Sequence, residues 1–136
     1  GYVETAYAKQ NNLTTTKLIN KDGKAVAATP EAIAAAAAGA DWSKAPGFYL
    51  ILTNEPGPNA WPISAATFIL LPKQPKSAAD AAVALGFFDW AYNKGDQLAA
   101  ELDYVPLPDS VVKLIREGWA KDVKGADGKP VFTLSN

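Results

Sequence analysis

The spacing of apolar and polar residues predicts helices and strands that alternate along the chain. Helices are predicted over five segments, residues 5–13, 29–39, 77–95, 96–102 and a last one from Asp109 onward. Strands are predicted where β-branched and aromatic residues cluster, at 1–4, 14–19, 48–53 and 67–71. Because strands and helices alternate, the expected fold class is α/β with largely parallel strand pairing.

The predicted boundaries carry capping and turn signals. Thr29 is a good helix N-cap, followed by Pro30 at the first helical position and a carboxylate at Glu31. Ser77 precedes the third helix, with Asp80 three residues later as a variant of the capping box. Asp-Gly dipeptides predict two tight turns, at 22–23 and 127–128.

Two apolar stretches lead to opposite expectations of burial. The alanine run 34–38 continues the second helix up to Gly39, and we expect it to form a surface helix. Residues 67–71 are a continuous apolar run, which is typical of a strand buried on both faces, so we expect 61–71 to be buried. Five aromatic residues are also expected in the core: Trp61, Phe87, Phe88, Trp90 and Trp119.

Composition narrows the possible chemistry. With 49% apolar and 20% charged residues and a net charge of −1, the chain has ordinary globular composition and no bulk charge that would attract nucleic acid. Histidine and cysteine are both absent, which removes histidine-dependent nucleophilic catalysis and zinc sites built on nitrogen or sulfur. Glu101 and Asp103 are two apart on a helical segment and point to different faces. We therefore expect no enzyme activity, no metal and no cofactor.

An anion site is not expected in this chain either. Such a site needs free backbone N–H groups at a helix start, hydroxyl donors and usually a bidentate arginine. The single arginine, Arg116, lies in the body of the last helix and is expected to face solvent. The three best helix starts carry their own acids, Glu31, Asp80 and Asp109, which would repel an anion. No catalytic, ligand-binding or metal residue is therefore assigned.

Several longer motifs nevertheless carry a family resemblance. They follow one another as 1–4, 6–12, 59–64 (Asn-Ala-Trp-Pro-Ile-Ser), 67–73, 87–92 (Phe-Phe-Asp-Trp-Ala-Tyr), 102–108 and 109–112. In this order they resemble the C-terminal portion of the periplasmic phosphate-binding protein of the bacterial phosphate ABC importer. The resemblance covers essentially the whole chain.

The resemblance implies a periplasmic-binding-protein type II-like fold with two lobes, of which this chain supplies only the C-terminal part of each. Residues 1–62 would belong to the middle lobe, and 63–136 would return to the lobe that also holds the N-terminus, with the crossing near 61–64. The phosphate ligands are expected in that N-terminal portion. The implied partners are inorganic phosphate, the complementary N-terminal segment and a permease, in the periplasm.

Two alternatives stay open. The chain could serve a binding protein for another oxyanion, such as sulfate or molybdate, or it could be a stand-alone structural or interaction module without a ligand. The chain contains no methionine and opens without a basic and apolar leader. These features favour a C-terminal piece separated from a longer protein, which is what the resemblance also implies.

Overall fold

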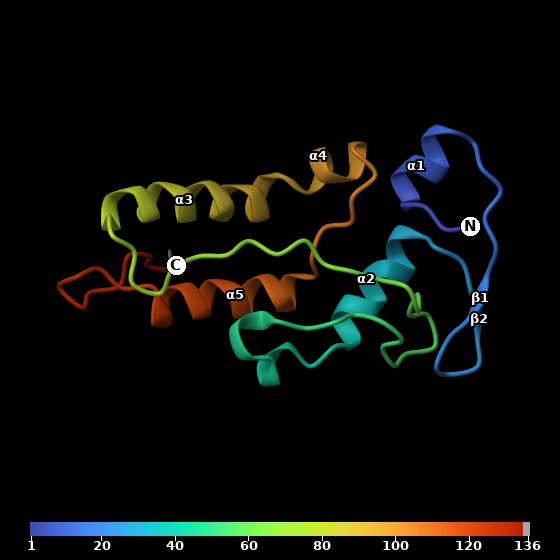
Figure 1. The fold of residues 1–136 in the computed structure, drawn as a ribbon, viewed down its shortest axis with the longest axis horizontal. Helices are drawn as coiled ribbons and strands as arrows, with labels where there is room; N and C mark the ends of the chain where they lie inside the picture. The colour runs from blue at the N-terminus through green and yellow to red at the C-terminus, as the bar shows by residue number, and fades with distance from the viewer. Residues whose placement is uncertain (135–136) are drawn as a thin grey trace. The chain divides into compact units, whose positions relative to one another are not determined.

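The computed structural model describes residues 1–134 (Figure 1). Its helices and strands are α1 Thr5–Gln10, β1 Leu18–Ile19, β2 Ala25–Val26, α2 Pro30–Gly39, α3 Ala78–Lys94, α4 Asp96–Glu101 and α5 Asp109–Asp122, with short 3-10 turns at Trp42–Lys44 and Pro46–Phe48. The chain divides into two compact units. The first unit comprises Gly1–Ala66 and Asp96–Pro108, and the second comprises Thr67–Gly95 and the chain from Asp109 on.

The two strands of the first unit form a short β-hairpin. Strands β1 and β2 pair antiparallel, with Leu18 opposite Val26. The turn between them contains Gly23 at φ +74°, which confirms the predicted Asp-Gly turn. The described chain thus contains both helices and strands, as the predicted α/β fold class requires. Within residues 1–134 the only sheet is this antiparallel pair, so the described chain does not by itself form a largely parallel sheet.

Helix α2 begins as predicted but packs differently from the prediction. The Thr29 hydroxyl accepts from the Ala32 N–H at 3.3 Å, which confirms the N-cap. Three alanines of the helix are buried, with Ala36 fully inaccessible. A methyl group added at Gly39 would lie 2.7 Å from the Pro56 carbonyl oxygen. The prediction that 34–38 form a surface helix is therefore wrong. Small side chains allow neighbouring backbone to approach this helix closely.

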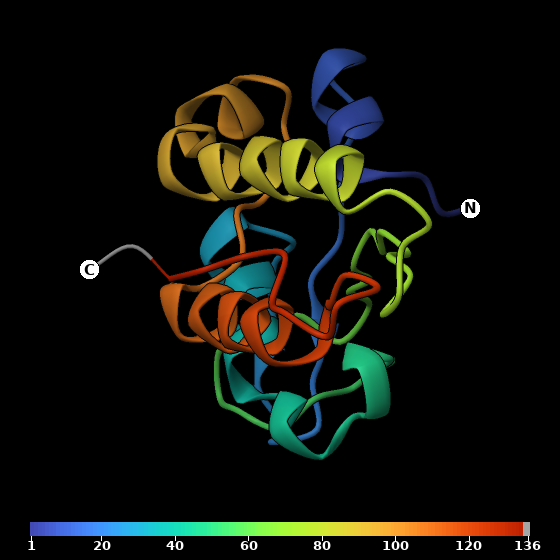
Figure 2. The same cartoon turned by 90° about the vertical axis from the view of Figure 1, so that its left-hand side faces the viewer.

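Helices α3 and α5 form the body of the second unit and run antiparallel, side by side (Figure 1, Figure 2). The predicted cap of α3 is confirmed, since the Ser77 hydroxyl accepts from the Asp80 N–H at 3.2 Å. Leu85 and Val111 are the largest fully buried side chains of the described chain. The Tyr92 and Trp119 rings stack with centroids 5.8 Å apart, which joins the two helices.

The expected buried strand at 67–71 is not present. Residues 67–71 belong to no strand, and Ile69 and Leu70 are 51% and 92% exposed. Within 61–71, Pro62 and Ser64 are buried but Ile63 is 65% exposed, so the prediction of continuous burial is wrong. The physical reason is that a strand needs a neighbour for its backbone, and Ile69, Leu70 and Leu71 form no backbone hydrogen bond with any described residue.

The predicted aromatic core is only partly realised. Phe87 and Trp90 are 59% and 50% exposed, so their assignment to the core is wrong. Trp61, Phe88 and Trp119 are partly buried. Helix α3 packs against α5 on one side only, which leaves Phe87 and Trp90 uncovered. Within residues 1–134, no helix is both long and apolar enough to cross a membrane.

Candidate functional site

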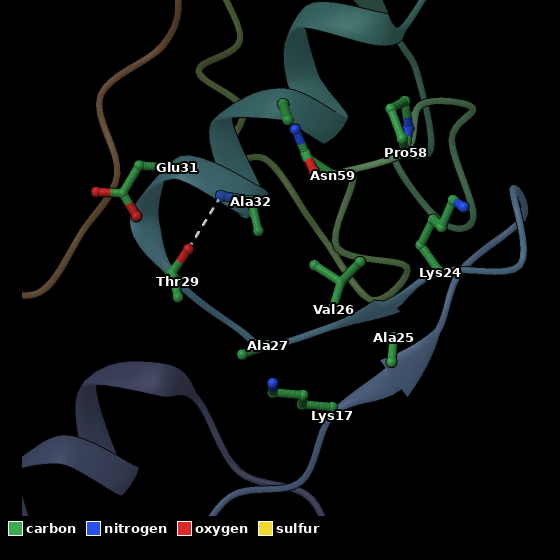
Figure 3. A pocket seen from close by; sticks show the side chains of 11 residues that line it. Lys17, Lys24, Ala25, Val26, Ala27, Thr29, Glu31, Ala32, Pro58 and Asn59 are labelled. Carbon is green, nitrogen blue, oxygen red and sulfur yellow. Dashed lines mark hydrogen bonds between the residues drawn. The ribbon is translucent and has the colours of Figure 1, made fainter.

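A concavity of the first unit lies beside the start of α2 (Figure 3). This α2 recess has a volume of about 530 Å³ and is open to solvent. Its walls come from the β1–β2 hairpin, the first two turns of α2 and the loop at Pro58 and Asn59. The polar side chains among its lining residues are Lys17, Lys24, Thr29, Glu31 and Asn59.

Asn20 joins two walls of the α2 recess. Its Oδ1 accepts from the backbone N–H groups of Asp22 and Lys24 at 3.1 and 2.9 Å, which shapes the hairpin turn. Its Nδ2 lies within hydrogen-bond distance of three carbonyl oxygens of the facing loop, those of Gly57, Pro58 and Ala60, at 3.0, 3.1 and 3.2 Å. Asn20 is only 5% exposed, so it is a buried polar residue whose groups are all satisfied.

The start of α2 has little capacity left for an anion. The Thr29 hydroxyl already accepts a hydrogen bond from the Ala32 N–H. A hydrogen bond from its own backbone N–H, and then one from Thr29, lowers the pKa of Glu31, so this carboxylate is ionised near neutral pH. In Figure 3, Glu31 and Lys24 lie on opposite sides of the helix start. The positive end of the helix dipole is thus already matched by a side chain of the helix itself.

The two lysines of the α2 recess do not make a rigid anion site either. Lys17 and Lys24 are exposed, and neither forms an ion pair within the described residues. A flexible ammonium group loses rotamer freedom when it is fixed on a ligand, so it is a weak element of a preorganised site. Ala25, Val26 and Pro58 supply apolar lining. The recess therefore lacks the converging, fixed donors that would hold a tetrahedral oxyanion.

Arg116 is committed to an ion pair within the second unit. Its Nε lies 2.7 Å from Asp89 Oδ1, in an orientation that does not satisfy hydrogen-bond geometry, and both atoms are buried. The two side chains are 21% and 22% exposed. The expectation that Arg116 faces solvent is therefore wrong, because its guanidinium connects α5 to α3. Its Nε is thereby held against a carboxylate of the same unit.

The remaining acidic candidates have separate roles. Gln97 donates to Glu101 Oε1 at 3.0 Å, whereas Asp103 pairs with Lys9 at 2.8 Å. The two carboxylates thus engage different partners, and Asp103 lies beyond the end of α4, at φ +61°. Asp80 lies in the first turn of α3 and Asp109 in the first turn of α5. Among the residues described, no group of three His, Cys, Asp or Glu side chains could hold a metal ion.

The segment 61–64, predicted as a lobe crossing, is tied to α2 and to a neighbouring loop. The Trp61 N–H donates to the Ala32 carbonyl at 2.9 Å, and the Asn54 N–H donates to the Pro62 carbonyl at 2.8 Å. The Ser64 hydroxyl donates to the Trp61 carbonyl at 3.0 Å. These bonds fix the segment within the first unit. Whether it also passes between lobes stays a prediction.

Asn20 is the one structurally central residue that sequence reasoning missed. The available signal was an asparagine that directly follows an apolar pair and precedes an Asp-Gly turn by two residues. Asparagine at such a position commonly accepts from the N–H two residues on. Its contacts with the loop at 57–60 are long-range, and a local pattern does not reveal them.

Comparison with known proteins identifies close relatives over almost the whole chain. No protein-family model matches it. The phosphate-binding protein PstS of Pasteurella multocida is 48% identical over 97% of this chain, which is 38% of that protein. The proteins of the same name from Xylella fastidiosa and Haemophilus influenzae are 50% and 47% identical over 91% of the chain, or 34% and 37% of their own lengths.

The chain thus spans a little over a third of the length of the curated relatives it matches. At about half of aligned positions identical, such agreement over more than 120 residues reflects common ancestry. The resemblance noted from the sequence motifs is confirmed as a family relationship, and its assignment to the C-terminal portion stays a prediction. The chain is a homologue of part of the phosphate-binding proteins.

Proposed function

We propose that this chain is part of a periplasmic binding protein that captures inorganic phosphate and delivers it to the permease of an ABC importer. The observation that carries the proposal is its 47–50% identity, over nearly its whole length, to proteins named for phosphate binding. Those names describe binding proteins, which also favours a role without catalysis. They favour phosphate over sulfate or molybdate.

Within that protein the chain acts mainly as scaffold, and the phosphate ligands lie on a complementary N-terminal segment. Two features of the described residues support this division. The start of α2 is satisfied by Thr29 and Glu31, and Arg116 is paired with Asp89. Both groups already engage a carboxylate or hydroxyl of the chain itself. In this proposal residues 1–62 and 63–136 contribute to two different lobes of a type II-like binding-protein fold.

Exposed apolar side chains support the need for a complementary segment. Large apolar residues with more than half of their surface accessible occur in both units, among them Ile19, Ile51, Leu70, Phe87 and Leu102. Side chains of this size are normally covered in a stable monomer when they gather in patches. A chain that functions with further polypeptide around it would leave such surfaces uncovered on its own.

Calorimetric titration with phosphate tests the proposal. The chain alone, checked by intact mass, should show no saturable binding in the micromolar range. A polypeptide that joins the chain to the part of the Pasteurella relative it does not align with should bind phosphate at micromolar concentration or tighter, and sulfate much more weakly. Micromolar binding by the chain alone would contradict the scaffold role, and a joined polypeptide that prefers sulfate would contradict phosphate as the ligand.

A further inference from the structure

The charged side chains of this chain are unevenly divided between its two units. The first unit carries five lysines against eight carboxylates, whereas the second carries seven lysines and one arginine against six carboxylates. The net charge of −1 therefore combines a negative first unit with a positive second unit. Local surplus charge, as well as the overall balance, decides how a protein responds to a charged surface.

The positive surplus of the second unit is concentrated at one end, which we call the lysine face. The end of α5, the start of α3 and the loop that follows α5 lie there together (Figure 1). Five of the eight cationic residues of the unit belong to this end, and all five are exposed: Lys73, Lys76, Lys121, Lys124 and Lys129. Three acids accompany them, Asp80, Asp122 and Asp127. The other charged residues of the unit are three cations and three carboxylates, so the surplus lies at this end.

Backbone contacts hold the segments of the lysine face together. The Lys124 N–H donates to the Lys73 carbonyl at 2.9 Å. The Gly125 N–H donates to the Lys129 carbonyl, also at 2.9 Å. A methyl group added at Gly125 would lie 3.4 Å from the Cβ of Ala78, which places the start of α3 beside this loop. The fold therefore fixes the backbone positions from which the five lysines extend.

The charges of the lysine face are crowded and only partly neutralised. The Lys73 ammonium lies 2.8 Å from Asp122 Oδ2. It is the main cause of the lowered pKa of the Asp122 carboxyl, and two neighbouring lysines lower that pKa further. The lysines of the face without a direct ion pair among the described residues are Lys76, Lys121 and Lys124. One carboxylate is thus shared by several ammonium groups, which leaves positive charge available to an external anion.

The residue types of the lysine face favour a lipid surface over a protein partner. The face contains no arginine, and the single arginine of the chain is paired with Asp89. Protein–protein interfaces are enriched in arginine and aromatic anchors and depleted of lysine. Lysine ammonium groups are hydrated point charges on flexible stems, which suits headgroup phosphates that move laterally and impose no fixed geometry. Anionic phospholipid is therefore the partner that these side chains fit best.

We infer that the lysine face is an electrostatic docking surface for the anionic phospholipid headgroups of a membrane. The inference goes beyond the proposed function, because docking to lipid requires neither phosphate nor the complementary segment. It relies on the proposed function only for the nearness of a membrane, to which delivery to a permease brings the protein. Attraction of the second unit and repulsion of the first orient the molecule on that surface and raise its local concentration there.

Vesicle flotation gives the direct test. The chain is mixed at low salt with vesicles of phosphatidylcholine alone, or with vesicles in which about two lipids in five are phosphatidylglycerol. Half-maximal binding to the anionic vesicles should need about tenfold less lipid, and raising the salt from about 0.02 to 0.2 M should weaken it about tenfold. The neutral vesicles measure binding through exposed apolar side chains such as Phe87 and Trp90. Equal binding to both vesicles, or binding that does not respond to salt, overturns the inference.

A matched pair of triple variants tests whether the lysine face is the surface that binds. The first variant removes the lysines of the face that form no direct ion pair: Lys76→Gln, Lys121→Gln and Lys124→Gln. The second removes the same charge from the first unit: Lys17→Gln, Lys21→Gln and Lys24→Gln. Affinity for the anionic vesicles should fall about tenfold in the first variant and less than about threefold in the second, with thermal unfolding unchanged in both. Equal losses of affinity would show that only net charge matters and would overturn the inference.

The outcomes separate this inference from the proposed function. A polyglutamate peptide that the chain binds more tightly than the anionic vesicles, through the same lysines, would identify an acidic polypeptide as the partner and overturn the lipid assignment. The lysine-face variant of the joined polypeptide should bind phosphate as tightly as the unchanged polypeptide. Loss of vesicle binding with phosphate binding retained therefore reports on the lysine face alone. Absence of phosphate binding by the unchanged joined polypeptide contradicts the proposed function and leaves the vesicle result standing.

Discussion

Helix α2 and residues 67–71 show opposite relations between side-chain size and burial. In α2 the side chains are mostly single methyl groups, yet Ala32, Ala36 and Ala37 are 5% exposed or less. In residues 67–71 they are large and apolar, yet Leu70 is 92% exposed. Hydrophobicity alone would rank the two regions in the reverse order.

The difference comes from the neighbours available to each backbone. Helix α2 satisfies its own hydrogen bonds, and its small side chains allow the backbone at Pro56 and Trp61 to come close. An extended segment cannot satisfy its own N–H and C=O groups, so it needs adjacent strands before its side chains can be buried. In this chain, burial depends on a partner for the backbone first and on apolar surface second.

The largest expected effect contrasts two leucines of the second unit. Leu85 is fully buried, so Leu85→Ala should lower the free energy of unfolding by about 2–5 kcal/mol through lost burial and a residual cavity. Leu70→Ala should change it by less than about 0.5 kcal/mol, because the side chain is already in solvent. Urea denaturation midpoints measure both. Equal losses would show that residues 67–71 are packed in the chain alone.

The next effect concerns the residue that joins the walls of the α2 recess. Asn20→Ala should lower the free energy of unfolding by about 3 kcal/mol, because buried carbonyl and N–H groups of the loop and the turn lose their partner. Asn59→Ala is the matched control, since Asn59 is exposed, and it should cost less than about 0.5 kcal/mol. Thermal unfolding at neutral pH measures both variants. An Asn20 variant as stable as the control would refute its role as a buried tie.

Overpacking tests the close approach around α2. Ala36→Leu should destabilise the chain by about 2 kcal/mol, because Ala36 is fully inaccessible and the added atoms have no space. Ala38→Leu lies two residues further on an exposed position of the same helix, so the change in stability should be within about 0.5 kcal/mol. If both leucines were tolerated equally in chemical denaturation, the surface-helix expectation would be restored.

Local signals in the sequence predicted the helix boundaries well. The strands predicted at 1–4 and 48–53 are not formed, and the one predicted at 14–19 is limited to Leu18–Ile19. Thr29 and Ser77 cap α2 and α3 as expected, and both Asp-Gly dipeptides lie in turns. These features depend on residues within four positions of one another, which a single sequence contains. Glu101 and Asp103 engage different partners, but Asp103 lies beyond the end of α4 and not on the helix that the sequence reasoning assumed.

Burial could not be predicted in the same way, because it depends on contacts between distant segments. The alanine run of α2 is buried by a loop more than 15 residues away, and Arg116 is neutralised by Asp89 on another helix. The apolar pattern of 67–71 predicts a strand, but these residues belong to no strand of the described chain. The role of Asn20 at the candidate site could not be predicted for the same reason, because its contacts with 57–60 are long-range.

The smallest expected effect concerns the anchor at the end of the 67–71 segment. The Lys73 ammonium, which lies 2.8 Å from Asp122, lowers the pKa of that carboxyl below its ordinary value of 3.8. A lowered pKa in the folded state means that the stabilisation is present above about pH 3.8 and is lost as the pH falls through the lowered pKa. Lys73→Gln should therefore raise the pKa of Asp122 and reduce the loss of stability in acid.

The side chains of Lys73 and Asp122 are 72% and 41% exposed, so solvent screens the pair and its effect on stability should be small. A carbon-detected NMR titration of the Asp122 carboxyl measures the shift directly. Lys76→Gln is the control, because Lys76 is exposed and forms no ion pair among the described residues. If both variants leave the Asp122 titration unchanged, the ion pair does not anchor this segment. Its attachment would then rest on the Lys124 N–H bond to the Lys73 carbonyl.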